Sequence, residues 1–132
     1  MDKGPGRRTS LLIVEDDMDT AEMLEAFFQA EGYDTHAVAW GQDAVQMCHQ
    51  DPPDAVILDI RLPDIDGFEV CRQLRNSFGT AHIPIVFLTE KDRLADKIAG
   101  LETGAIDYIT KPFDMRELKL RVRNALRRPS PW

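Results

Sequence analysis

The stretch Ala55–Asp59, which reads AVILD, decides the fold of this 132-residue chain. Four apolar residues run without interruption into a carboxylate, and a short apolar run without alternation indicates a strand buried on both faces. Pro63 and Gly67 interrupt regular structure after it and predict a loop. Because ligands of open α/β sheets bind where the strands end, Asp59 is a candidate for chemistry, although an Asp at this point could equally cap the turn that follows.

The same reasoning, applied outward from this strand, predicts five strands that alternate with five helices. Apolar or loosely alternating runs mark the strands, and apolar residues at helical spacing mark the helices, as Leu94, Ile98 and Leu101 do for the fourth. Short connections between them favour a parallel sheet with right-handed crossovers and helices on both faces. The expected fold is a three-layer, flavodoxin-like (βα)5 α/β fold with strand order 2-1-3-4-5. The predicted strands cover residues 11–14, 33–39, 55–58, 84–89 and 107–110, and the second helix covers residues 41–50.

Length, charge and cysteine content exclude several classes of protein. A chain of this length forms one domain, which we place at residues 10–128, with a flexible lead at residues 1–9 and a linker-like tail at residues 129–132. The net charge of -7 argues against direct nucleic-acid binding. The sequence has no apolar run of about 18 residues to span a membrane, and no signal peptide is expected. Cys48 and Cys71 lack CxxC spacing and are predicted to be buried free thiols of a cytoplasmic protein.

Polar side chains stand at the ends of four of the predicted strands. Glu15 and Asp16 follow the first strand and Asp59 follows the third, while Thr89 ends the fourth and Lys111 follows the fifth. In a sheet of order 2-1-3-4-5 these strands are neighbours, so their carboxyl ends share one crevice. Taken singly, each residue has an ordinary structural role as a helix cap, a strand-end hydroxyl or a solvated lysine. Because all of them are expected at the same edge of one sheet, a shared functional site is favoured over separate structural roles.

The chemistry of this group of residues points to phosphoryl transfer. Carboxylates that share a crevice repel one another, so either a pKa rises or a cation binds, and Mg²⁺ is expected because it prefers oxygen ligands. An Asp nucleophile, a lysine, a hydroxyl and Mg²⁺ are the groups that such a reaction needs. A dehalogenase-type phosphohydrolase is an alternative, but it needs a second Asp where this chain has Arg61. A flavodoxin-like cofactor binder is another, but it needs a phosphate-binding loop in place of the acidic residues 15–19.

The element order and these motifs resemble the receiver domain of two-component response regulators over residues 9–128. The resemblance implies that Asp59 is the phosphoacceptor and that a sensor histidine kinase is the donor. It implies Mg²⁺ held by Asp16, Asp59 and the backbone carbonyl of Arg61, with Glu15 acting mainly through water. Lys111 would contact Asp59 before the transfer and the phosphoryl oxygens after it. Apart from Mg²⁺-dependent self-phosphorylation and autodephosphorylation, no enzymatic activity is expected.

The resemblance also implies a switch. Thr89 would hydrogen-bond a phosphoryl oxygen, and Tyr108 would turn into the space that Thr89 vacates. That movement would change the surface formed by the fourth helix, the fifth strand and the fifth helix. The changed surface would control an output partner or a C-terminal output domain that lies outside this chain.

The last third of the chain is most similar to receivers of the winged-helix transcription-factor class. Such receivers pair as symmetric dimers through the surface named above, so a homodimer and a role in transcription regulation are expected. The candidate ion pairs across the dimer are Lys97 with Glu117 and Asp107 with Arg121. The same residues could equally form a solvated charged surface, where an exposed pair contributes at most about 1 kcal/mol.

Overall fold

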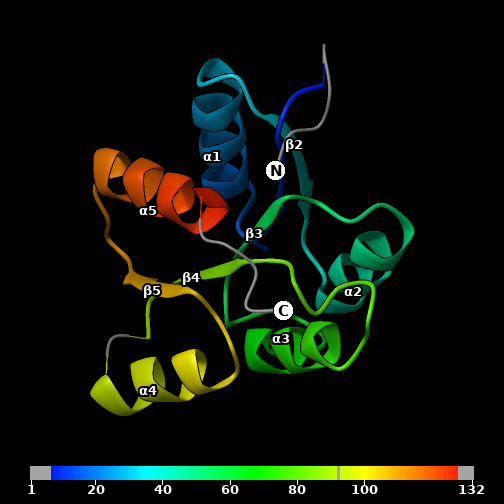
Figure 1. Cartoon of the computed structure of the whole chain (residues 1–132). Helices are drawn as coiled ribbons and strands as arrows, with labels where there is room; N and C mark the ends of the chain where they lie inside the picture. The colour runs from blue at the N-terminus through cyan, green and yellow to red at the C-terminus, as the bar shows by residue number, and fades with distance from the viewer. Residues whose placement is uncertain (1–6, 92, 128–132) are drawn as a thin grey trace.

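The computed structural model describes residues 7–91 and 93–127. Five parallel strands form one sheet of order β2-β1-β3-β4-β5, which confirms the predicted flavodoxin-like (βα)5 fold (Figure 1). The strands are β1 (Ser10–Val14), β2 (Asp34–Val38), β3 (Ala55–Leu58), β4 (Ile85–Thr89) and β5 (Asp107–Thr110). The helices are α1 (Met18–Ala30), α2 (Gly41–Gln50), α3 (Gly67–Arg75), α4 (Leu94–Glu102) and α5 (Met115–Arg127).

The sheet separates two layers of buried side chains. Figure 1 shows α1 and α5 on one face of the sheet and α2, α3 and α4 on the other. Because side chains alternate along a strand, Leu12 and Val14 of β1 join the core beneath α2 and α3, whereas Leu11 and Ile13 join the core beneath α1 and α5. The central strands β1, β3 and β4 are buried almost throughout, as their uninterrupted apolar runs predict.

Local sequence signals set the ends of several elements. Asp17 is the N-cap of α1, and its carboxylate accepts the backbone N–H of Thr20 at 3.0 Å. Gly32 and Gly104 follow α1 and α4 with φ angles of +97° and +95°, a left-handed conformation that glycine adopts without strain. Helix α2 has the predicted limits, and the edge strand β2 is one residue shorter at each end than the predicted 33–39.

The apolar residues that predict α4 do not pack into the core. Leu94, Ile98 and Leu101 are 72%, 49% and 47% exposed, and Gly100 is the buried residue of this helix. The helix meets the rest of the domain at Gly100, where the ring of Tyr108 approaches its backbone. Helical spacing therefore predicted the helix correctly, but an apolar stripe on it need not face the core, because the helix docks through its small residue instead.

Other predictions concern the cysteines, the membrane and the ends of the chain. Cys48 and Cys71 are buried free thiols, as predicted. None of the described helices has the length and the apolar content that crossing a membrane requires. The predicted tail at residues 129–132 lies outside the described residues, as do residues 1–6 of the predicted lead and residue 128.

Candidate functional site

The residues predicted at the strand ends do meet at one edge of the sheet. Lys111 follows β5, and its Nζ lies 2.5 Å from Oε1 of Glu15 and 3.2 Å from Oδ2 of Asp59. Its backbone N–H also donates to the carbonyl of Thr89 at 2.8 Å, where β5 runs beside β4. The parallel sheet thus brings together four residues that lie up to 96 positions apart in the chain.

Two of the three carboxylates at this edge are shielded from solvent. Glu15 and Asp59 are only 5% and 7% exposed, whereas Asp16 is open to solvent. Each of the three offers one oxygen, and these oxygens all lie within 4.8 Å of one another. Such a cluster of carboxylate oxygens suits a hard divalent cation such as Mg²⁺. The exposed side of the cluster, at Asp16, leaves room for the several waters that Mg²⁺ keeps. The donor set therefore fits the predicted metal.

The charges at this edge depend on one another. Burial raises the pKa of Glu15, although Lys111 and the N–H of Asp17 donate hydrogen bonds to its carboxylate. Burial disfavours the ammonium of Lys111, but the hydrogen bond to Glu15 and the charge of Asp59 outweigh this and raise the pKa of the lysine. Lys111 is thus held in its charged form between two carboxylates.

Residues 60–66, the part of the loop between β3 and α3 that follows Asp59, position this residue. The backbone N–H of Arg61 donates to Oδ1 of Asp59 at 3.1 Å, so the loop and Lys111 hold the two carboxylate oxygens from different sides. The loop ends at Gly67, whose N–H donates to the carbonyl of Ile60 at 2.8 Å. A Cβ atom at Gly67 would lie 2.4 Å from the backbone oxygen of Asp59, so a side chain at this position would displace the phosphoacceptor candidate.

The two predicted switch residues are linked through the backbone of Lys91. The hydroxyl oxygen of Thr89, which is fully buried, accepts the N–H of Lys91 at 3.5 Å. The hydroxyl of Tyr108 donates to the carbonyl of Lys91 at 2.7 Å, and its ring packs at 5.8 Å from that of Phe87. Tyr108 is therefore tied to the loop that follows β4. No sequence signal pointed to Lys91 as the link, because its backbone rather than its side chain makes both contacts.

Asp107 and Arg121, whose predicted pairing across a dimer a single chain does not test, form an ion pair within this chain. Within one chain, Nη1 of Arg121 lies 3.0 Å from Oδ2 of Asp107, and Nη2 of the same arginine lies 3.3 Å from Oε2 of Glu117. The pair forms internally because α5, which carries Arg121, packs beside β5, which carries Asp107. Lys97 lies on α4, and its predicted pairing with Glu117 across a dimer is not tested by a single chain.

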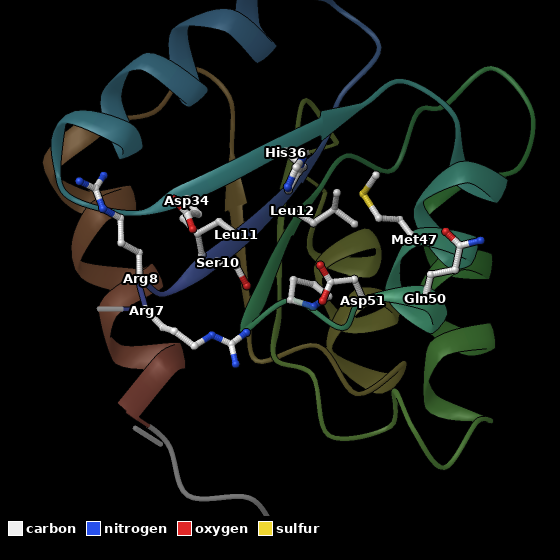
Figure 2. A pocket seen from close by; sticks show the side chains of 11 residues that line it. Arg7, Arg8, Ser10, Leu11, Leu12, Asp34, His36, Met47, Gln50 and Asp51 are labelled. Atoms are coloured by element: carbon white, nitrogen blue, oxygen red, sulfur yellow. The ribbon is translucent and has the colours of Figure 1, made fainter. Parts of the chain in front are cut away.

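A separate cavity lies at the opposite end of the strands. It has a volume of about 510 Å³ and lies between the start of β1 and the end of α2, with His36 and Met47 on its walls (Figure 2). Its lining carries both signs of charge, because it includes two acidic residues, Asp34 and Asp51, and two basic residues, Arg7 and Arg8. None of the residues that line it belongs to the group around Asp59.

Comparison with known proteins agrees with this geometry. The family model of the response regulator receiver domain matches residues 11–123. A structure from Chloroflexus aurantiacus described as a response regulator is 43% identical, with a TM-score of 0.88 over 92% of this chain and 100% of that one. The BeF3-activated N-terminal receiver domain of RstA from Klebsiella pneumoniae is 35% identical, with a TM-score of 0.85 over 91% and 100% of the two chains.

A third structure bears on the metal. The receiver domain of a sensor histidine kinase from Pseudomonas aeruginosa is 31% identical, with a TM-score of 0.84 over 91% of this chain and 98% of that one. It is described with a magnesium ion coordinated in the active-site cleft.

Proposed function

This chain belongs to the response regulator receiver domain family, and from that premise we propose that Asp59 accepts a phosphoryl group from the phosphohistidine of a sensor histidine kinase. The observation that carries the proposal is the partly buried contact of Lys111 with both Asp59 and Glu15 at the ends of the strands. A structural ion pair needs one carboxylate, whereas this lysine lies between two, beside a third carboxylate on the open side.

In the proposed reaction, a carboxylate oxygen of Asp59 attacks the phosphorus atom. The new O–P bond forms as the N–P bond of the phosphohistidine breaks, and the imidazole nitrogen keeps the electron pair. Lys111 stabilises the negative charge that spreads over the phosphoryl oxygens, and the N–H of Arg61 keeps Asp59 oriented. Mg²⁺ bound by Asp16, Asp59 and the carbonyl of Arg61 would supply the remaining positive charge, with Glu15 acting mainly through water.

Phosphorylation would be read through Thr89 and Tyr108. The hydroxyl of Thr89 accepts the N–H of Lys91 in this structure and would donate its own proton to a phosphoryl oxygen. A movement of Thr89 toward the phosphoryl group would lengthen its contact with Lys91 and so alter the loop to which Tyr108 is tied. The altered surface comprises α4, β5 and α5, and it would control a partner or output domain in transcription regulation in the cytoplasm. Beyond its own phosphorylation and dephosphorylation, the domain would have no enzymatic activity.

We propose that a homodimer forms through the same surface. Leu94, Ile98 and Leu101 form an exposed apolar stripe on α4, and Leu120 on α5 is also half exposed. Monomeric domains seldom expose such stripes unless these bind a partner. Asp107 and Arg121 pair within the chain in this structure, so their predicted pairing across the dimer would require that contact to be exchanged between the two chains.

The phosphoacceptor is tested by mass measurement after incubation with acetyl phosphate and Mg²⁺. The wild-type protein should gain one phosphate, and Asp59→Asn should gain none. Asp54→Asn is the matched control, because Asp54 is also a partly buried aspartate that binds a backbone N–H, at the opposite edge of the sheet. Phosphate on Asp59→Asn, or none on the wild type, would contradict the proposal.

A further inference from the structure

The loop between β3 and α3 is held against a second helix by one carboxylate. Asp64 accepts the N–H of Gly41 on Oδ1 at 2.7 Å and the N–H of Gln42 on Oδ2 at 2.9 Å. These two groups are the first of α2, whose own N-cap residue, Trp40, makes no side-chain capping bond. Asp64 therefore caps α2 from a distant part of the sequence.

The charged form of Asp64 is suited to this contact. Burial is the largest single effect on Asp64 and disfavours its carboxylate, but the backbone N–H groups around it, those of Gln42 and Gly41 foremost, together outweigh burial and lower its pKa. A negative charge at the amino end of a helix is also favoured by the helix dipole. The contact between the loop and α2 thus persists at neutral pH.

A second contact shows that the loop and α2 are closely fitted. A Cβ atom at Gly41 would lie 2.6 Å from Cγ1 of Ile65 and 3.2 Å from its backbone oxygen. Ile65 packs against the core beneath α2 and α3. The absence of a side chain at Gly41 therefore lets the loop lie directly on the helix, on the side that Asp64 binds.

The same loop carries both groups that Arg61 contributes to the site. Its N–H donates to Asp59, and its carbonyl is the proposed ligand of Mg²⁺. Arg61 lies three residues before Asp64, with Pro63 between them, so a shift of the loop at Asp64 would move Arg61 as well. The other carboxylate of the loop, Asp66, accepts the N–H of Glu69 at 2.9 Å and so caps α3, the helix that directly follows the loop.

We propose that Asp64 is a positioning residue for the phosphorylation site: by capping α2 it holds the loop that places Arg61 against Asp59 and the metal. The inference rests on the proposed function of Asp59. It assigns Asp64 no contact with the phosphoryl group. Partners that orient the ligands of a metal typically change its affinity by about 10–100-fold when removed, and we expect the lower end because Asp64 acts through three residues of chain.

The test compares Asp64→Asn with Asp54→Asn. Asparagine retains one oxygen that can accept a backbone N–H of α2. Its amide NH2 group replaces the other oxygen, so one of the N–H groups of Gly41 and Gln42 loses its acceptor. Asp54 is the control because it accepts the N–H and the hydroxyl of Ser10 at the opposite edge of the sheet, so its loss affects stability without touching the loop. Gly41→Ala is a second variant, which presses on Ile65 and leaves every charge in place.

Two measurements report on the loop without a phosphoryl donor. Trp132→Phe leaves Trp40, beside the contact, as the single tryptophan, and its fluorescence follows a Mg²⁺ titration. Hydrogen–deuterium exchange of residues 60–66 in metal-free protein reports the order of the loop itself. Asp64→Asn and Gly41→Ala should weaken Mg²⁺ binding by about 10-fold and speed exchange in the loop, whereas Asp54→Asn should do neither.

The outcomes separate this inference from the proposed function. Asp64→Asn with wild-type Mg²⁺ affinity or wild-type exchange in residues 60–66 would overturn the inference, as would an equal loss of affinity in Asp54→Asn. Wild-type protein that binds Mg²⁺ but gains no phosphate would overturn the function proposed for Asp59 and leave the role of Asp64 in the loop standing.

Discussion

Replacing Gly100 by alanine tests whether α4 and Tyr108 share space as the structure shows. The new Cβ would lie 2.7 Å and 2.9 Å from Cδ2 and Cε2 of Tyr108, and 3.2 Å from Cδ2 of Phe87. Real side-chain atoms do not approach the ring so closely, so the ring of Tyr108 must move. Its movement would also strain the hydrogen bond from its hydroxyl to the carbonyl of Lys91.

Two opposing effects set the magnitude. Alanine is favoured over glycine inside a helix by about 1 kcal/mol. Overpacking of a close contact costs about 1–3 kcal/mol. In the wild-type background Gly100→Ala should therefore lower the free energy of unfolding by about 0–2 kcal/mol. In a Tyr108→Ala background the ring is absent, and Gly100→Ala should raise the free energy of unfolding by about 1 kcal/mol.

The assay is urea unfolding followed by circular dichroism, on the single and double variants. The coupling between the two positions should be about 1–3 kcal/mol, well above the roughly 0.3–0.5 kcal/mol expected of independent sites. Gly79→Ala is the control, because its Cβ would meet nothing within 4 Å. If Gly100→Ala stabilises the protein equally in both backgrounds, the ring of Tyr108 does not occupy the space beside α4.

Three further predictions concern charge, burial and assembly. Because the pKa of Lys111 is raised in the folded state, its contribution to stability is complete below the ordinary value of 10.5 and is lost as pH rises through the raised pKa. In Lys111→Met the free energy of unfolding should therefore fall less steeply above pH 10.5 than in the wild type. An unchanged slope would contradict the contact of Lys111 with the two carboxylates. Burial raises the pKa of Cys48 to about 12, so Ellman's reagent should label it far more slowly in the native protein than in urea, and equal rates would show that the thiol is accessible. In sedimentation runs, the phosphoryl mimic beryllofluoride should convert the wild type to a dimer but leave Ile98→Asp monomeric; a wild type that stays monomeric would refute the dimer.

Much of the site followed from local sequence because a parallel sheet aligns the carboxyl ends of its strands. Once the runs before Glu15, Asp59 and Lys111 were identified as strands in the order 2-1-3-4-5, these residues had to meet at one edge. The glycine after the loop, Gly67, was interpreted only as a break in regular structure. Its close approach to the backbone of Asp59 could not be predicted, because that distance depends on how α3 returns to the sheet.

The sequence by itself determined the alternation of strands and helices, the buried strands and the residues placed at their ends, because these depend on the spacing of apolar residues along a local stretch. Only the tertiary structure decided which face of α4 is exposed, that Arg121 binds Asp107 of its own chain, and that Asp64 caps a helix some 22 residues earlier in the sequence. Those contacts join elements that are distant along the chain. They are set by how helices settle on the sheet, and the periodicity of a single helix carries no information about its neighbours.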